Sequence, residues 1–314
     1  MNFFDAIFQG FVQGLTEFLP VSSSGHLAIC QHITGMQENN LFFSVMLHIG
    51  TLTAVIAIYF KLVIKLFSSL VNIVKKIFKK QFKWSEMNGE ENLAMMILIG
   101  LLPLFALFIP IPGTGMKIKD LAEKLSLDGY FIVVGIALIG TSTLLFLGNR
   151  AKPKIKIIDG KKYKKKPRRR YNVADALAVG GAQCLAAIFP GLSRSGSTLA
   201  ASQLRGINRQ VALDYSFLLG TPAIVAAALL ETKDALFAAN GGASGVNFFY
   251  VISGMIISAV VGFFAIKIFK WMLTTDKMYI FILYTAAAGV LVIITSVIEL
   301  ITGSNLFTGQ PLHF

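Results

Sequence analysis

Six apolar runs in the sequence are each close to the length that crosses the hydrocarbon core of a bilayer. They cover approximately residues 41–60, 93–110, 131–148, 211–231, 247–267 and 279–301. A helix needs about 20 apolar residues to cross such a core. Charged residues make up only 14% of the 314-residue chain, whereas soluble domains usually carry about 25%. The sequence therefore predicts an all-α polytopic membrane protein with six transmembrane helices, and it disfavours a soluble α/β enzyme.

Two further apolar stretches are interrupted by polar residues. Stretch 3–34 contains PVSSSGH, and stretch 172–205 contains PGLSRSGST. Each arm has only about 10–17 residues, which is short for a membrane span. We therefore expect two re-entrant helix-loop-helix hairpins. Non-helical backbone at membrane depth is tolerated only inside protein or beside a wet cavity, so both loops should border one polar site.

Lys and Arg are concentrated in four gaps between the apolar runs. The gap at 61–92 holds seven and the gap at 149–171 holds twelve of the 29 basic residues, and smaller groups lie at 205–209 and 267–277. Short basic loops stay cytoplasmic. The first hairpin should then enter from outside, the second from the cytoplasm, and both termini should lie outside. The 149–171 loop is either a solvated topological signal or a site for anionic lipid head groups, and its pattern does not predict nucleic-acid binding.

The two interrupted stretches are similar to each other. At a constant offset of 170 residues, seven positions are identical, and Pro20 and Ser23 match Pro190 and Ser193. Farther along, FSVMLHIGT at 43–51 resembles YSFLLGT at 215–221. Together with the opposite orientations of the hairpins, this predicts inverted repeats. We expect one integral membrane domain, 1–314, with repeat one at about 1–148, the cytoplasmic basic loop at 149–171 and repeat two at about 172–301.

The first hairpin carries groups suited to acid–base chemistry. Gln13 and Glu17 are four residues apart and share a helix face, and Pro20 then ends the helix. The free amides at the start of the next helix suit an anion. An ionisable residue at membrane depth is functional by default, although Glu17 also has a structural interpretation as a counter-ion. The polar residues that follow Pro20 are Ser22, Ser23, Ser24, Gly25 and His26.

The second hairpin has no Glu or His in its loop but supplies Arg194. Arginine is always charged and binds phosphate in a bidentate manner, so the two hairpins together suit a di- or triphosphate. Serine runs in membrane helices are also common as close-packing surfaces, and that alternative stays open for Ser22 and Ser24. For His32 and His48, which lie in apolar surroundings, we expect structural roles.

The motifs QGLTEFLPVSSSGHL at 13–27 and PGLSRSGST at 190–198 resemble the two signatures of the bacterial undecaprenyl-diphosphate phosphatase family, the bacitracin-resistance type. The resemblance covers essentially the whole chain. It implies hydrolysis of undecaprenyl diphosphate to undecaprenyl phosphate and phosphate, which recycles the lipid carrier for cell-wall synthesis. It also implies the bacterial cytoplasmic (inner) membrane, an active site open to the outer, periplasmic side, and a divalent metal ion, Mg²⁺ or Ca²⁺.

The resemblance also implies roles for individual residues. The expected catalytic residues are Glu17, Ser23, His26 and Arg194. Glu17 and Gln13 are the expected metal ligands, and the family often has Glu where this chain has Gln13. Ser23 is favoured as the nucleophile with His26 as its base, but His26 itself or a water molecule remain alternatives. The expected substrate-binding residues are Ser22, Ser24, Gly25, Ser193, Ser195 and Thr198.

A second class of function also fits the sequence. Inverted repeats with broken helices are how many transporters hold anions, so a transporter or flippase of a phosphorylated polyprenyl lipid is the alternative. Release of phosphate from a prenyl diphosphate would distinguish the two. Partners are the polyprenyl diphosphate lipid and the bilayer, and the sequence leaves open whether the chain forms a homodimer.

Overall fold

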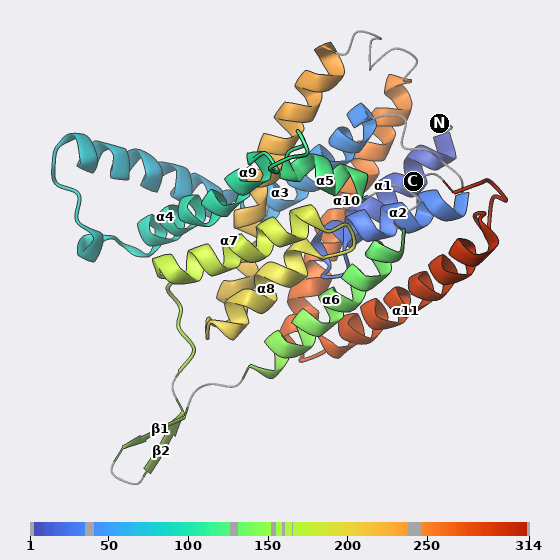
Figure 1. The fold of residues 1–314 in the computed structure, drawn as a ribbon. Coiled ribbons are helices and arrows are strands. Elements are labelled where there is room, and N and C mark those ends of the chain that lie inside the picture. Colours follow the sequence, from blue (N-terminus) through green and yellow to red (C-terminus); the bar gives the residue numbers. More distant parts are fainter. Residues whose placement is uncertain are drawn as a thin grey trace.

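The computed structural model describes residues 3–34, 41–125, 131–151, 155–158, 161–164, 166–237 and 247–312 (Figure 1). Within these ranges, six helical segments are long and apolar enough to cross a membrane, which confirms a helical polytopic protein. They overlap the six predicted spans. The segments are α3 (Leu41–Phe78), α4 (Gly89–Leu101) continued by η2 (Leu102–Phe108), α6 (Phe131–Arg150), α9 (Arg209–Phe237), α10 (Phe248–Thr274) and α11 (Tyr279–Thr302).

The two interrupted stretches each form two shorter helices joined by a tight turn. The first comprises α1 (Phe3–Phe18) and α2 (Ser23–Thr34), and the second comprises α7 (Val173–Ile188) and α8 (Arg194–Leu204). Each break contains a proline, Pro20 or Pro190, as the sequence predicted. The short helices η1 (Trp84–Glu86) and α5 (Ile118–Lys124) complete the helical elements of the described residues.

Helix α3 is much longer than the predicted span at 41–60. Its backbone leaves helical geometry at Tyr59 (φ −104°, ψ 16°) and then continues to Phe78. The extension forms because apolar residues continue between the lysines of 61–78, with no proline or glycine to stop the helix. Figure 1 shows the far end of α3 projecting together with the start of α4.

The helical fold class is confirmed, and a small two-stranded sheet in the basic loop is an addition that the sequence did not predict. Strand β1 (Ile155–Ile158) pairs antiparallel with β2 (Lys161–Lys164), with Ile155 opposite Lys164. The three isoleucines of β1 are β-branched residues that favour extended backbone. The hairpin projects away from the helices (Figure 1).

The end of the basic loop is held at the start of α7. Asn172 and Asp175 form a capping box there, and both oxygens of the fully buried Asp175 carboxylate accept from Arg168, at 2.6 and 2.9 Å. Arg205, at the end of α8, donates to the same carboxylate at 2.8 Å. The hydrogen bonds from Arg168 to Asp175 raise the pKa of Arg168. Asp175 therefore links the basic loop to both helices of the second helical pair.

Glycines set the closest helix contacts. Gly10 of α1 lies directly against Gly254 of α10, and Gly180 of α7 lies directly against Gly100 of α4, with no room for a Cβ atom at Gly10 or Gly180. Gly10 and Gly180 are one of the identical pairs at the offset of 170 residues. Small residues let helix backbones approach in this way in membrane proteins. Each half of the chain therefore makes one such glycine contact with the other half.

Candidate active site

The turn between α1 and α2 is built by a proline and a serine in an unusual conformation. Pro20 follows the last turn of α1, and Ser22 has a φ of 75°, which is uncommon for any residue except glycine. Ser22 is buried, and its Oγ accepts a hydrogen bond from the Gly25 amide at 3.2 Å. The serine therefore satisfies one free amide at the start of α2, as an N-cap does.

The turn between α7 and α8 leads into a helix that is capped in the same way, although its positive φ lies at a different position. Gly191 supplies the positive φ, 94°, and Ser193 caps α8 by accepting from the Gly196 amide at 3.1 Å. The predicted alignment of Ser23 with Ser193 is therefore one residue out of register, because the capping serines Ser22 and Ser193 occupy the same place. The extra residue of the second turn lies before its capping serine. Ser23 and Arg194 consequently stand at equivalent positions, each directly after the cap.

The two turns touch each other. Ser24 Oγ accepts from the Gly191 amide at 3.4 Å, and Ser195 Oγ donates to the Leu19 carbonyl at 3.2 Å. A Cβ atom on Gly25 would stand 3.0 Å from the Gly191 Cα atom. The turns are thus packed backbone to backbone, which explains why both are rich in glycine and serine.

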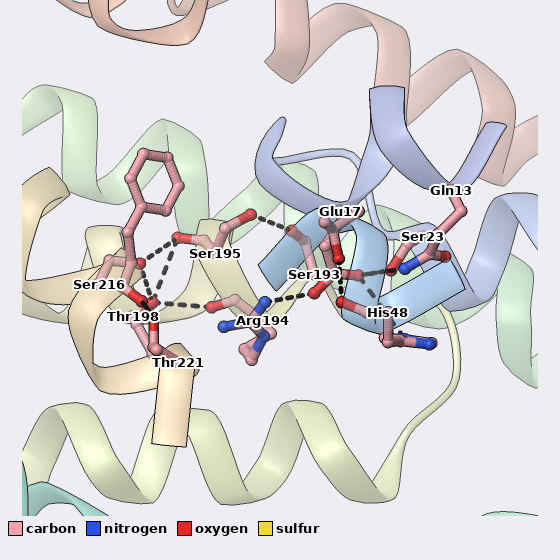
Figure 2. Close-up of polar contacts among 12 residues, drawn as sticks. Gln13, Glu17, Ser23, His48, Ser193, Arg194, Ser195, Thr198, Ser216 and Thr221 are labelled. Atoms are coloured by element: carbon pink, nitrogen blue, oxygen red, sulfur yellow. Dashed lines mark hydrogen bonds and ion pairs between the residues drawn. The ribbon is translucent and has the colours of Figure 1, made fainter. Parts of the chain in front are cut away.

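Glu17 is the point at which the two helical pairs converge (Figure 2). Its buried carboxylate accepts from Ser23 Oγ at 2.7 Å and from Gln13 Nε2 at 3.0 Å, both through Oε2. Its other oxygen, Oε1, accepts from Arg194 of the second pair. Figure 2 shows Arg194 reaching Glu17 from one side and Ser23 and Gln13 from the other. The expected Glu17, Ser23 and Arg194 therefore form one hydrogen-bonded group.

A glycine on α9 makes room for the arginine. Arg194 passes over Gly220 so closely that a Cβ atom at Gly220 would overlap the guanidinium group. The Arg194 side chain keeps 21% of its surface exposed. It is therefore held in place by Gly220 and Glu17, yet it can still meet a ligand.

The other polar residues of the second turn support the backbone around Arg194. Thr198 is fully buried, and its Oγ1 donates to the Arg194 carbonyl at 2.8 Å and lies 2.5 Å from Ser216 Oγ. Thr141 of α6 donates to the Gly191 carbonyl at 3.1 Å and accepts from the Ser193 amide at 2.8 Å. These contacts fix the turn that carries the guanidinium.

The ring nitrogens of His26 contact groups other than Ser23 and Glu17. Its Nδ1 lies 2.7 Å from the Ser22 carbonyl, which can only accept, so Nδ1 carries a proton. Its Nε2 lies 2.7 Å from the hydroxyl of Tyr284 on α11, and the two rings stack at 5.6 Å. Both ring nitrogens therefore have partners. The proton acceptor beside Ser23 is Glu17 and not His26, which was expected to be its base.

His48 of α3 is the imidazole that faces Glu17. Its Nε2 lies 3.9 Å from Glu17 Oε2, and 31% of the side chain is exposed. A structural role was expected for both His48 and His32. His32 is buried against Glu299, at 2.8 Å, which agrees with that expectation, whereas His48 lies at the edge of the group around Glu17 (Figure 2).

Comparison with known proteins assigns this chain to a family. The family model described as "Bacitracin resistance protein BacA" matches residues 6–291, which is most of the chain. This chain belongs to the BacA family. A relative named undecaprenyl-diphosphatase from Alkaliphilus metalliredigens is 35% identical over 300 residues, covering 95% of this chain and 100% of the relative.

Other BacA relatives match over nearly the same length. The undecaprenyl-diphosphatase of Halothermothrix orenii is 35% identical, covering 94% of this chain and 98% of the relative. Undecaprenyl-diphosphatase 4 of Bacillus thuringiensis is 32% identical, covering 93% of this chain and 97% of the relative. The family match at residues 6–291 includes both turns and at least part of each of the six long apolar helices.

The residues around Glu17 fit a divalent cation. Gln13 is fully buried, and its Oε1 has no hydrogen-bond partner among the residues that the structure describes. Half a turn of the amide would exchange Oε1 with Nε2 and bring a carbonyl oxygen to the Glu17 carboxylate. Two oxygens meet there without repulsion only if a cation or a proton lies between them, and such oxygens are the ligands that Mg²⁺ and Ca²⁺ prefer.

Four of the residues that complete this site were missed by the sequence-based reasoning. They are Thr141, Ser216, Gly220 and Tyr284. A signal existed for two of them, since Ser216 and Gly220 lie in YSFLLGT, the segment that resembles the segment containing His48. Thr141 and Tyr284 lie within apolar helices, and only the three-dimensional packing identifies them.

Proposed function

We propose that this chain hydrolyses undecaprenyl diphosphate to undecaprenyl phosphate and inorganic phosphate in the bacterial cytoplasmic membrane. The observation that carries the proposal is the group formed by Glu17, Ser23 and Arg194. It joins a proton acceptor, a nucleophile and a fixed positive charge at the junction of two broken helical pairs. The names of the full-length relatives agree with this activity.

Both helical pairs are proposed to be re-entrant hairpins. The 16 residues of α1 and α7 are about 24 Å long, and the 12 and 11 residues of α2 and α8 reach only about 18 Å or less. A hydrocarbon core is about 30 Å thick. With the basic gaps placed in the cytoplasm, the first hairpin enters from outside and the active site opens to the periplasmic side.

The chain is proposed to be a single membrane domain built from two inverted repeats, at about 1–148 and 172–301, with the basic loop 149–171 between them. Two observations support this division. Gly10 and Gly180, at matching positions, each contact a glycine of the opposite repeat. In addition, Ser22 and Ser193 cap the two turns in the same way. The equivalent positions after these caps carry Ser23 in one repeat and Arg194 in the other.

The terminal phosphate of the substrate is proposed to bind between Ser23 and Arg194. Arg194 exchanges its bond to Glu17 for the phosphoryl oxygens and stabilises the charge that develops on them. Ser24, which is exposed, contributes a further donor at the start of α2. Gly25 acts indirectly, because its amide already donates to Ser22 Oγ. The hydroxyls of Ser22, Ser193, Ser195 and Thr198 act indirectly, because each already bonds within or between the turns.

Ser23 is proposed as the nucleophile. Its proton passes to Glu17, its Oγ bonds to the terminal phosphorus, and the bond from that phosphorus to the bridging oxygen breaks, releasing undecaprenyl phosphate. The proton held by Glu17 leaves with undecaprenyl phosphate. Water then attacks the phosphoserine and passes a proton to Glu17, which returns it to Ser23 Oγ as the bond from Oγ to phosphorus breaks and inorganic phosphate leaves. His26 is not the base in this scheme, because its ring nitrogens are bonded to the Ser22 carbonyl and the Tyr284 hydroxyl. Attack by His26 or by water directly are the alternatives.

A divalent metal ion, Mg²⁺ or Ca²⁺, is proposed to be held by Glu17 and by Gln13 Oε1. When bound, it supplies positive charge that neutralises phosphate oxygens during phosphoryl transfer. Gln13 would present Oε1 to the ion by exchanging it with Nε2, which now donates to Glu17.

Phosphate release and phosphoenzyme trapping test the proposal. The purified chain in detergent should release inorganic phosphate from undecaprenyl diphosphate, and Arg194→Ala should lose most of this release. A quenched reaction should carry phosphate on Ser23. Binding of the lipid without any phosphate release would favour a transporter or flippase, and phosphate found on His26 would reassign the nucleophile.

A further inference from the structure

We propose that His48 is a third ligand of the divalent metal ion, through Nε2, beside Glu17 and Gln13 Oε1. The inference rests on the metal site proposed above and adds a nitrogen donor to it. It starts from the short separation of two side chains on different helices, since His48 Nε2 on α3 lies 3.9 Å from Glu17 Oε2 on α1.

The tautomer of His48 is set by its own helix. Its Nδ1 lies 2.9 Å from the carbonyl of Ser44, one turn earlier, so Nδ1 donates and Nε2 keeps a lone pair in the neutral ring. Metal-binding histidines almost always have this arrangement, in which the nitrogen that does not bind the metal donates to a backbone carbonyl or carboxylate. His26 differs, because both of its nitrogens already have partners.

The distance between His48 Nε2 and Glu17 Oε2 suits two ligands of one ion. At 3.9 Å the atoms are too far apart for a hydrogen bond. Two atoms that are each about 2.1 Å from one metal ion lie roughly 3 to 4.2 Å apart, depending on the angle between them. A lone pair that faces a carboxylate oxygen is repulsive unless a positive charge lies between them. Gln13 lies beside the same carboxylate and would add an oxygen donor if its amide were turned over, since Nε2 now faces Glu17.

A nitrogen ligand changes which metal the site prefers. Mg²⁺ and Ca²⁺ bind oxygen donors, whereas imidazole suits first-row transition metals such as Zn²⁺, Fe²⁺ and Ni²⁺. Mn²⁺ accepts both kinds of donor. With His48 in the set, the site should favour a transition-metal dication over Mg²⁺. His48 would also compensate for the neutral amide of Gln13, which contributes no charge to the set.

Mn²⁺ bound to the full-length, detergent-purified chain without a histidine tag tests this assignment by electron spin-echo spectroscopy. We expect ¹⁴N modulation from a directly bound imidazole in the wild type, loss of that modulation in His48→Gln, and retention in the matched control His26→Gln. His48→Gln should also weaken Mn²⁺ binding about tenfold or more and reduce the selectivity for Mn²⁺ over Mg²⁺.

Two results would overturn the proposal, and they are distinguishable. If wild-type Mn²⁺ binding depends on Glu17 but shows no imidazole modulation, or if the modulation persists in His48→Gln, then His48 is not a ligand while the Glu17 site stands. If Glu17→Gln leaves Mn²⁺ binding unchanged, the metal site itself is wrong and the assignment of His48 fails with it.

Discussion

Replacing Gly220 by alanine should inactivate the enzyme through Arg194. The added Cβ atom would overlap the guanidinium group, so Arg194 must leave its position beside Glu17. The rest of the fold should tolerate the change, because the clash is with the flexible end of a side chain. In addition, alanine is favoured over glycine in a helix interior by about 1 kcal/mol.

The size of the loss follows from what Arg194 supplies. Removing one preorganised donor to a developing oxyanion reduces kcat about 10²–10³-fold, which corresponds to roughly 3–4 kcal/mol. We expect Gly220→Ala to fall in this range. Gly181→Ala is the matched control, because a Cβ atom at Gly181 on α7 would meet no atom within 4 Å, and its rate should stay within about twofold of the wild type.

The assay is release of inorganic phosphate from undecaprenyl diphosphate in detergent, with thermal unfolding as the check on folding. If Gly220→Ala acts through Arg194, adding it to Arg194→Ala should cause little further loss, because residues that act as a unit are non-additive. The reasoning is refuted if folded Gly220→Ala keeps near-normal activity. It is also refuted if the two substitutions reduce the rate independently.

Three further substitutions test other contacts. Ser23→Ala should abolish the trapped phosphoenzyme and reduce phosphate release at least 10²-fold, and persistence of a phosphoenzyme would exclude Ser23 as the nucleophile. Tyr284→Phe removes the hydroxyl beside His26 Nε2 and should reduce the rate roughly two- to tenfold; an unchanged rate, measured beside an inactive His26→Ala, would show that His26 acts without this bond. Asp175→Asn should lower stability by on the order of 2 kcal/mol, seen as a lower unfolding temperature, whereas Asp276→Asn, in an exposed pair with Arg209, should change it little; equal effects would contradict the role given to buried Asp175.

The sequence predicted the helices well because their signals are local. Apolar run length identified the six long helices, and Pro20 and Pro190 marked the two breaks. The far half of α3 was missed because its lysines interrupt the apolar run without stopping the helix. The β1–β2 hairpin was missed because the basic composition of the loop concealed its β-branched residues.

The site was predicted only in part, because side-chain direction depends on packing between distant helices. The motifs identified Glu17, Ser23 and Arg194, which the structure brings together. His26 was expected to serve Ser23, but its ring faces Tyr284 on α11, 258 residues away. His48 gave no local signal of a role, and only the contact between α1 and α3 brings it near Glu17.

The central claim is that Ser23 of the first turn and Arg194 of the second belong to one active site. A double-mutant cycle tests this claim most directly, with phosphate release from undecaprenyl diphosphate measured for Ser23→Ala, Arg194→Ala and the double variant. The account predicts that each single change removes most of the activity. The double variant should retain about the same activity as the less active of the two single variants. Losses that multiply in the double variant would show that the two residues act independently, and would contradict a shared site.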